Sequence, residues 1–334
     1  MLSAPISQEK SGVARQSVFI TRAIPEEGVA VLNEAGLTVH VNPHHRPLQP
    51  EELIKEVGRH DGVICQMVDR IDQKVLQAAA GRCRVIATCA VGYDNIDVAA
   101  AAKLGIVITH TPDVLTETTA DLAWTLMLSA ARRAGEGERV VRAGQWRGWG
   151  MMDFLGTDVF GKTLGIVGAG RIGTAVARRA SGFRMKLLYH ARTSKPEMEA
   201  LGARRVALNE LLESSDFVSL HVPLTEETRH LIDEKALGRM KRDAILINSA
   251  RGAVVDQDAL IAALAGGRLA AAGLDVYAHE PAVPPELVRL ENVVLLPHIG
   301  SATVATRTEM ARRAARNVVA VLRGEAAPNP VRLP

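Results

Sequence analysis

The sequence predicts an α/β protein with two doubly wound parallel-sheet domains of the Rossmann and flavodoxin-like kind. Three observations support this fold class. Short β-rich runs alternate with helical patterns through two long stretches of the chain, and a glycine-rich turn follows an apolar run in the second stretch. The length of 334 residues also suits two domains, each large enough to bury a core.

The first stretch covers about the first hundred residues and predicts one parallel sheet with helices on its faces. Its expected strands and helices follow one another in the order typical of such a domain. The strands are Val18–Thr21, Thr38–Val41, Gly62–Cys65, Val85–Cys89 and Val107–Thr109, and the helices lie near Glu26–Ala35, Glu51–Val57, Gln73–Ala79 and Val98–Leu104.

A long alanine-rich segment follows, and it predicts a single helix over about Thr116–Ala134. Trp124, Met127 and their neighbours make it apolar on more than one face, so we expect it to be buried between domains or subunits. The next segment, Gln145–Phe160, is rich in Gly, Trp and Met without a clear period, and this predicts a loop.

The second alternating series begins at Lys162 and predicts a second parallel sheet. Its strands are expected near Leu164 and at Lys186–Tyr189, Phe217–Leu220, Ala244–Asn248, Ala271–Asp275 and Val293–Leu296. A last helix over Ala302–Leu322 and a proline-containing tail close the chain. We therefore expect a substrate-binding domain at 1–110 plus 302–334 and a nucleotide-binding domain at 111–301, with an interdomain helix at about 114–134.

Composition excludes several function classes. The formal charge of +3 is small and no basic block with interleaved aromatics occurs, so nucleic acid is not an expected partner. The apolar runs stop well short of the ~18 residues of a membrane span, and Met1–Arg15 lacks the apolar core of a signal peptide. No membrane association is therefore expected.

The cysteines and histidines predict neither disulfides nor a metal site. Cys65, Cys83 and Cys89 are odd in number and lack C-x-x-C spacing, which favours reduced core thiols in a cytoplasmic protein. The pair His44 and His45 has no further ligands at a useful spacing, so no metal is expected.

The turn Gly168-Ala169-Gly170-Arg171-Ile172-Gly173 comes directly after the apolar run that ends at Val167. In such a turn the first glycine permits the bend, the second lets backbone approach a pyrophosphate, and the third lets helix and strand pack closely. The N-terminus of the following helix would then face the phosphates. The glycines alone are a weak signal, but the surrounding strand and helix patterns predict a dinucleotide site here.

The carboxyl ends of the neighbouring strands are the expected place for chemistry, because ligands of open parallel sheets collect there. Arg251 can bind a carboxylate through its guanidinium, His298 can supply a proton near neutral pH, and Glu280 can stabilise its imidazolium. Each residue alone also fits a structural role: an ion pair for Arg251, a solvated loop residue for Glu280, a cap or core residue for His298. Their gathering on one rim favours catalysis.

The segment after the second strand of this series indicates which dinucleotide binds. Sites for NAD usually place an acidic residue about 20 residues beyond the glycine turn, whereas NADP sites carry a cation. This chain has Arg192 and Thr193 there and no acid, so NADPH is expected to be preferred, with NADH possible. An exposed basic loop without this role is the alternative.

The ordered motifs resemble those of the D-isomer-specific 2-hydroxyacid dehydrogenases, over nearly the whole chain. Besides the glycine turn they are His221-Val222-Pro223, Asn248-Ser249-Ala250-Arg251-Gly252, Gly273-Leu274-Asp275-Val276, Glu280-Pro281 and Pro297-His298-Ile299-Gly300-Ser301. Within the family, the segments Thr111–Asp121 and Leu296–Thr303 look most like glyoxylate/hydroxypyruvate reductases.

The resemblance implies a role for each matching residue. It implies that Arg251 binds the substrate and polarises its carbonyl, that Glu280 pairs with the histidine, and that His298 is the acid/base. The loop with Val91 and Gly92 resembles the family's substrate-carboxylate loop. The cofactor site is expected to contain Gly168, Gly170, Arg171, Ile172, Gly173, Arg192, Thr193, His221, Pro223, Thr228, Ser249, Ala250 and Asp275.

The expected reaction is therefore the NADPH-dependent reduction of a small 2-keto acid to the D-2-hydroxy acid. The same fold could instead act on 2-ketogluconate, an aryl-pyruvate or phosphite, because fold does not settle substrate choice. A cofactor-sensing binding protein similar to transcriptional corepressors of this family is a rival of another class. The apolar helix and the Trp-rich loop suggest a homodimer.

Overall fold

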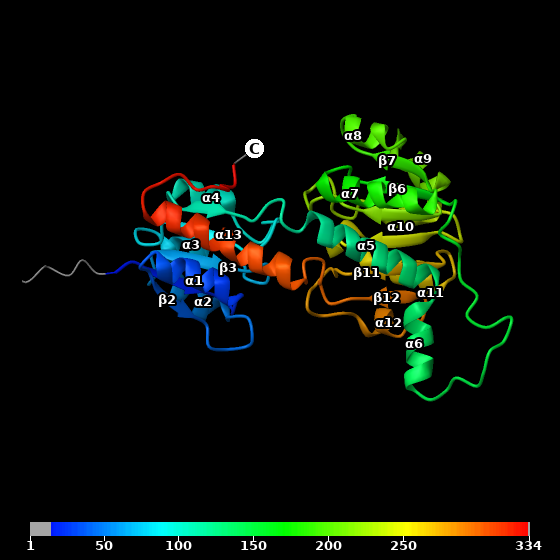
Figure 1. The fold of residues 1–334 in the computed structure, drawn as a ribbon, viewed down its shortest axis with the longest axis horizontal. Helices are drawn as coiled ribbons and strands as arrows, with labels where there is room; N and C mark the ends of the chain where they lie inside the picture. Colours follow the sequence, from blue (N-terminus) through cyan, green and yellow to red (C-terminus); the bar gives the residue numbers. More distant parts are fainter. Residues whose placement is uncertain (1–14, 333–334) are drawn as a thin grey trace, which may run out of the picture. The chain divides into compact units, whose positions relative to one another are not determined.

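The computed structural model describes residues 15–332, and the chain folds into two compact units (Figure 1). The first unit contains residues 15–112 and 304–332, and the second contains 113–303. Most of the N-terminal segment Met1–Arg15 lies outside the described residues. Within 15–332, no helix is both long and apolar enough to cross a membrane.

The first unit is built on a five-stranded parallel sheet in the order β2-β1-β3-β4-β5. This order is the flavodoxin-like one. Its elements are β1 (Ser17–Ile20), α1 (Glu26–Glu34), β2 (Thr38–Val41), α2 (Pro50–Val57), β3 (Gly62–Cys65), α3 (Gln73–Ala79), β4 (Val85–Thr88), α4 (Val98–Lys103), β5 (Val107–Thr109) and α13 (Val304–Leu322).

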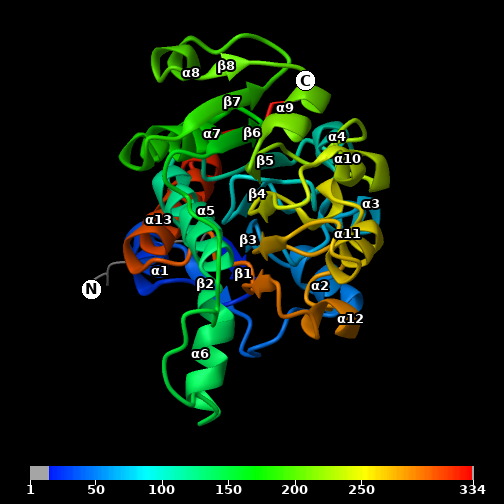
Figure 2. The ribbon, with the colours of Figure 1, turned by 90° about the vertical axis from the view of Figure 1, so that its right-hand side faces the viewer.

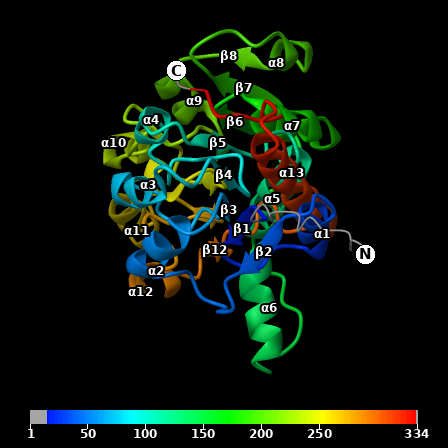
Figure 3. The same ribbon diagram turned by 90° about the vertical axis from the view of Figure 1, so that its left-hand side faces the viewer.

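Successive residues of a strand point to opposite faces of a sheet, and both faces of this one are buried. Val63 and Cys65 of β3 belong to the core under α2, α3 and α4, whereas Ile64 packs with α1 and α13. Figure 3 shows α1 and α13 on one side of the strands and α2, α3 and α4 on the other. The predicted doubly wound arrangement is therefore confirmed for this unit.

The second unit holds a seven-stranded parallel sheet in the order β12-β11-β10-β9-β6-β7-β8. Six of these strands follow the Rossmann order, and β12 extends that sheet. The elements are α5 (Thr116–Ala131), α6 (Ala134–Arg142), β6 (Thr163–Val167), α7 (Arg171–Arg179), η1 (Ala180–Phe183), β7 (Lys186–His190), α8 (Pro196–Ala200), β8 (Arg204–Arg205), α9 (Leu208–Ser214), β9 (Phe217–Leu220), α10 (Glu234–Arg239), β10 (Ile245–Asn248), η2 (Gly252–Val254), α11 (Gln257–Ala265), β11 (Ala271–Leu274), α12 (Pro285–Val288) and β12 (Val293–Leu295).

Both faces of the second sheet are also covered. Helices α5 and α7 lie on one face, and α9, α10, α11 and α12 lie on the other (Figure 2). Because every strand is parallel, the carboxyl ends of β6, β9, β10, β11 and β12 share one edge of this sheet. The glycine turn and the predicted catalytic residues follow those ends.

The expectation of one helix over about Thr116–Ala134 is wrong at its carboxyl end. The helix ends at Ala131, Arg133 has a left-handed backbone with φ 51°, and a separate helix, α6, starts at Ala134. The apolar faces of α5 are covered by α7 and by strands β10, β11 and β12 of its own unit. Its apolar character is thus accounted for by packing inside the unit.

Candidate active site at the carboxyl edge of the seven-stranded sheet

The glycine turn between β6 and α7 has the geometry that its three glycines require. Gly168 has φ 97°, and a Cβ there would lie 2.7 Å from the carbonyl carbon of His221. At Gly173 a Cβ would collide with the carbonyl oxygen of Gly168, so the helix packs tightly on the turn. A Cβ at Gly170 would meet no atom within 4 Å, which leaves open space beside that backbone.

The N-terminus of α7 has no side chain that caps it. Gly170 is the N-cap residue and provides no side-chain hydrogen bond to the helix N–H groups. The guanidinium of Arg171 is exposed and pairs with Asp113 at 2.7 Å, while Ile172 packs on the core beneath. The first turn of this nine-residue helix can therefore receive an anion.

Beyond β7, Arg192 and Thr193 lie exposed in a bend. The guanidinium of Arg205, on β8, donates to the carbonyl oxygens of Ala191 at 3.1 Å and Arg192 at 2.7 Å and so fixes this bend. The sequence interpretation missed Arg205, because a two-residue strand leaves no periodic signal.

The loop after β9 is fixed by its own side chains. Nε2 of His221 lies 2.8 Å from Oγ of Ser219, and burial lowers the pKa of His221 to about 4. The Thr228 hydroxyl donates to the carbonyl oxygen of Pro223 at 2.6 Å and accepts from the N–H of Thr225 at 2.8 Å. Thr228 therefore shapes the loop that carries His221 and Pro223.

The segment after β10 carries Ser249, Ala250 and Arg251. Asn248 braces it, since its side chain accepts from the N–H of Ala250 at 3.1 Å and donates to the carbonyl oxygen of Arg251 at 2.9 Å. One guanidinium nitrogen of Arg251 also donates to the carbonyl oxygen of Ala250 at 2.9 Å. The Ser249 hydroxyl is buried and has no hydrogen-bond partner among residues 15–332.

His298 and Glu280 form a direct pair. Nδ1 of His298 lies 2.7 Å from Oε2 of Glu280, and their side chains are 25% and 30% exposed. Burial acts to raise the pKa of Glu280, but its bond to His298, the charge of His298 and the N–H of Tyr277 outweigh it, so this pKa is lowered. The carboxylate is thus kept ionised beside the ring.

Asp275 holds the backbone next to this pair. It is 1% exposed, and its two oxygens accept from the N–H groups of Ile299 at 2.7 Å and Gly300 at 2.8 Å. Burial raises the pKa of Asp275 against the effect of these two bonds. Asp275 was expected to be a cofactor residue; the structure places its carboxylate on the loop that carries His298.

In the first unit, Val91 and Gly92 follow β4 at the carboxyl edge of the five-stranded sheet. The carbonyl oxygen of Val91 lies 3.0 Å from Nδ1 of His110. The N–H groups of Val91 and Gly92 bond to no acceptor among the described residues, as an anion-binding backbone requires.

The second unit's edge fits a dinucleotide. The open space beside Gly170, the uncapped first turn of α7, the buried hydroxyl of Ser249 and the cation Arg192 provide a surface for phosphates and polar groups. Across residues 15–332, no cluster of three or more His, Cys, Asp or Glu side chains could hold a metal ion. Fold and site together define a dinucleotide-binding protein of the doubly wound class.

Comparison with known proteins identifies the family. Residues 124–300 match the model of the "D-isomer specific 2-hydroxyacid dehydrogenase, NAD binding domain". The glyoxylate reductase of Thermococcus kodakarensis is 53% identical over 319 residues, which cover 94% of this chain and 95% of that protein. The chain belongs to the D-isomer-specific 2-hydroxyacid dehydrogenase family and is a nicotinamide-dinucleotide-dependent dehydrogenase, which confirms the resemblance seen in the sequence.

Solved structures agree with this assignment. The TT0316 protein of Thermus thermophilus superposes with a TM-score of 0.89 at 48% identity, over 95% of this chain and all of that one. An NADPH-dependent glyoxylate/hydroxypyruvate reductase of Sinorhizobium meliloti, in complex with NADP and malonate, gives a TM-score of 0.83 at 33% identity, over 95% of this chain and 97% of that one. The predicted fold class is confirmed.

Proposed function

We propose that this protein reduces a small 2-keto acid, glyoxylate or hydroxypyruvate, to the D-2-hydroxy acid, with His298 as the acid/base. The observation that carries the proposal is the 2.7 Å pair of His298 and Glu280, which lies at the same sheet edge as the glycine turn. The names of the relatives support the substrate class, since the Thermococcus kodakarensis and Korarchaeum cryptofilum proteins, at 53% and 52% identity, are both glyoxylate reductases.

In this proposal Glu280 determines which nitrogen of the His298 ring exchanges a proton with the substrate. Its carboxylate accepts a hydrogen bond from Nδ1–H, so Nε2 is the nitrogen that exchanges a proton with the substrate. No hydrogen bond reaches Nε2 from any residue in 15–332. The lowered pKa of Glu280 keeps the carboxylate charged while the ring is protonated.

The remaining proposed roles concern the substrate. A reduced nicotinamide, when bound, would supply a hydride, that is, one proton with two electrons. As the keto carbon is reduced, His298 would give its proton to the carbonyl oxygen, and the ring would then regain a proton from water. Arg251 polarises the carbonyl and stabilises charge on its oxygen, and the Val91 and Gly92 N–H groups bind the substrate's carboxylate.

His298→Ala tests the reaction, with the exposed neighbour of Glu280, His279→Ala, as its control. We expect H298A to lower kcat by about 10²- to 10⁴-fold, the usual contribution of a general acid, and to leave dinucleotide binding unchanged. H279A should match the wild type. Near-normal turnover by H298A would sink the proposal, as would wild-type protein that turns over none of glyoxylate, hydroxypyruvate, pyruvate, phenylpyruvate and 2-ketogluconate.

We further propose that NADPH is the preferred cofactor. The bend fixed by Arg205 leaves the Arg192 side chain exposed. Of the acids near this bend, Glu199 accepts from the hydroxyls of Ser194 at 2.5 Å and Tyr189 at 3.2 Å. Glu227, whose pKa the charge of Arg192 helps to lower, accepts from the hydroxyl of Thr225 at 2.7 Å. Both carboxylates are thus hydrogen-bonded within the second unit, and the exposed guanidinium of Arg192 can bind a 2′-phosphate.

Arg192→Ala tests this preference. A charge-assisted contact contributes about 1.5–3 kcal/mol, so KM for NADPH should rise by at least about tenfold while KM for NADH changes little. Arg239→Ala, which removes an exposed arginine paired with Glu213, controls for the loss of surface charge. Equal or better catalytic efficiency of the wild type with NADH would contradict the preference.

We also propose that the protein is a homodimer. The segment 141–160 of the second unit exposes a group of large apolar side chains, in which Trp149 is 80% exposed. Large apolar side chains exposed along one segment are typical of an interface. They are Val141, Trp146, Trp149, Met151, Met152, Phe154, Leu155 and Phe160.

Sedimentation of the wild type and of a Trp149→Asp, Met152→Asp double variant tests the dimer. The wild type should sediment at twice the chain mass and the double variant at the chain mass. A monomeric wild type at micromolar concentration would refute the proposal.

We keep the cytoplasm as the proposed location. Cys65, Cys83 and Cys89 are all free thiols, and burial raises the pKa of Cys83 and of Cys89 to about 12. Buried thiols of this kind fit the reducing conditions of that compartment.

A further inference from the structure

The loop that carries His298 has a backbone that must be held in place. His298 has φ 55°, in the left-handed region that side chains other than glycine rarely adopt. Such a conformation persists when surrounding contacts over-determine it. The side chains that hold this loop also fix where the imidazole of His298 lies.

Gly300, two residues after His298, is hydrogen-bonded through its backbone to two buried side chains. Asp275 accepts from the N–H of Gly300 at 2.8 Å, and the hydroxyl of Thr119 donates to its carbonyl oxygen at 3.1 Å. A Cβ at Gly300 would lie 3.4 Å from Oδ2 of Asp275 and 3.5 Å from Oγ1 of Thr119, so both side chains close around this residue. Gly300 is buried and Thr119 is 5% exposed, so water does not replace either bond easily.

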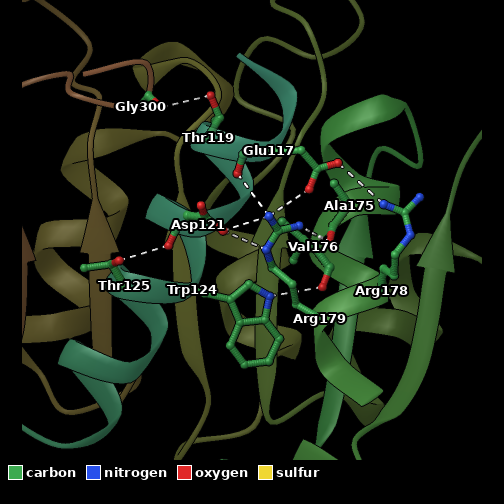
Figure 4. Close-up of polar contacts among 10 residues, drawn as sticks. All are labelled: Glu117, Thr119, Asp121, Trp124, Thr125, Ala175, Val176, Arg178, Arg179 and Gly300. Carbon is green, nitrogen blue, oxygen red and sulfur yellow. Dashed lines mark hydrogen bonds and ion pairs between the residues drawn. The ribbon is translucent and has the colours of Figure 1, made fainter. Parts of the chain in front are cut away.

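Thr119 lies on α5, and α5 is itself anchored to α7, as Figure 4 shows. The indole nitrogen of Trp124 donates to the carbonyl oxygen of Val176 at 3.0 Å. The guanidinium of Arg179 bridges Glu117 at 2.8 Å and Asp121 at 2.7 Å. Helix α5 therefore gives the Thr119 hydroxyl a rigid base, fixed to the helix that begins at the glycine turn.

We propose that Thr119 is a positioning residue for His298. Its hydroxyl and the carboxylate of Asp275 hold Gly300 from both sides, and so keep the His298 ring against Glu280 and at a constant place relative to the glycine turn. Thr119 acts through the loop, since its hydroxyl bonds to the backbone of Gly300 and not to the reacting groups. The proposal rests on the proposed function, because it requires His298 to be the acid/base.

Thr119→Val removes the hydroxyl and keeps the shape, Thr119→Ser keeps the hydroxyl, and Thr125→Val is the matched control. Thr125 lies on the same helix, and its hydroxyl donates to the carbonyl oxygen of Asp121 at 2.9 Å, inside the helix. Because a small misplacement of a catalytic group costs up to about 10²-fold, we expect T119V to lower kcat about tenfold. KM for the dinucleotide should stay within about twofold, since the glycine turn is untouched.

The pH profile separates positioning from a merely structural role. In T119V the acid/base limb of the kcat–pH profile should move, because the contact between His298 and Glu280 loosens. T119S should restore both kcat and the pH profile. T125V should resemble the wild type. If T119V fails to fold, Thr119→Ala, assayed below its melting temperature, provides the same comparison.

Two results would overturn the role of Thr119. One is a T119V enzyme with wild-type kcat and an unmoved pH profile; the other is a T119S enzyme as slow as T119V, which would mean that packing and not the hydroxyl matters. H298A, measured in the same assays, shows which of the two proposals fails. If H298A is inactive and T119V is unaffected, only the role of Thr119 is contradicted. If H298A has near-normal turnover, the proposed function itself is contradicted.

Discussion

The glycine turn and the histidine loop lie at the same edge of the seven-stranded sheet, but they are shaped by opposite means. The turn at 168–173 depends on side chains that are missing: a Cβ at Gly168 would press on His221, and one at Gly173 on Gly168. The loop at 298–300 depends on side chains that are present, with Asp275 and Thr119 on its backbone and Glu280 on its ring. A phosphate site is made by exposing backbone, whereas a proton donor must be fixed by its neighbours.

The glycine turn and the histidine loop also differ in how far apart their residues lie in the sequence. The turn is complete within six consecutive residues, so one motif describes it. The loop draws on Thr119, which is 181 residues away from Gly300 in the sequence. Its geometry therefore depends on the folding of the whole unit.

The largest effect is expected at Gly168. Alanine there would need the left-handed backbone and would press on the carbonyl group of His221, so G168A should lose about 3 kcal/mol of unfolding free energy. Gly170 has an ordinary φ of −82° and open space for a Cβ, so G170A should stay within about 0.5 kcal/mol of the wild type. Denaturant unfolding measures both.

The same pair tests the cofactor site. G170A should bind the dinucleotide at least about tenfold more weakly, because its methyl group occupies the space that the phosphates need. Binding can be followed by the fluorescence of the reduced dinucleotide. Unchanged affinity in a stable G170A would show that the phosphates lie elsewhere.

The contrast between the glycine turn and the histidine loop also explains which parts of the site could be predicted from the sequence. Arg251, Glu280 and His298 were predicted because each follows a strand whose apolar pattern is clear, and parallel strands bring their ends together. Thr119 was visible only as part of an expected helix, since a threonine inside a helix gives no sign of a distant carbonyl partner. The left-handed Arg133 was likewise missed, because neither glycine nor proline marks the break between α5 and α6.

The next effect is expected from Glu280→Gln, which tests whether side chains set the properties of the histidine loop. The amide can still accept from Nδ1–H but has no charge to stabilise the imidazolium, so kcat should fall by about 10- to 100-fold, or about 1.4–2.7 kcal/mol. The basic limb of the kcat profile should move to lower pH. An E280Q enzyme with an unmoved profile would show that the pair is structural.

A last pair of variants separates the two regions by the pH at which each loses stability. His221 touches the glycine turn and has a pKa lowered to about 4, so the unfolded chain takes up a proton first, below its usual pKa of about 6.5. Stability from His221 is therefore present above pH ~6.5 and is lost as the pH falls toward 4, by at most about 1.4 kcal/mol per pH unit.

Glu280 acts in a different window. Its lowered pKa in the folded state contributes stability above the usual glutamate pKa of about 4.3, and that contribution is lost as the pH falls below this value. Unfolding free energies measured from pH 7 to pH 3.5 should therefore be flatter between pH 6.5 and 4.5 in His221→Asn, and flatter only below about pH 4.5 in E280Q. If both variants flattened the unfolding free energy over the same pH interval, the two regions would titrate as one site. The distinction between a glycine turn shaped by backbone and a histidine loop shaped by side chains would then fail.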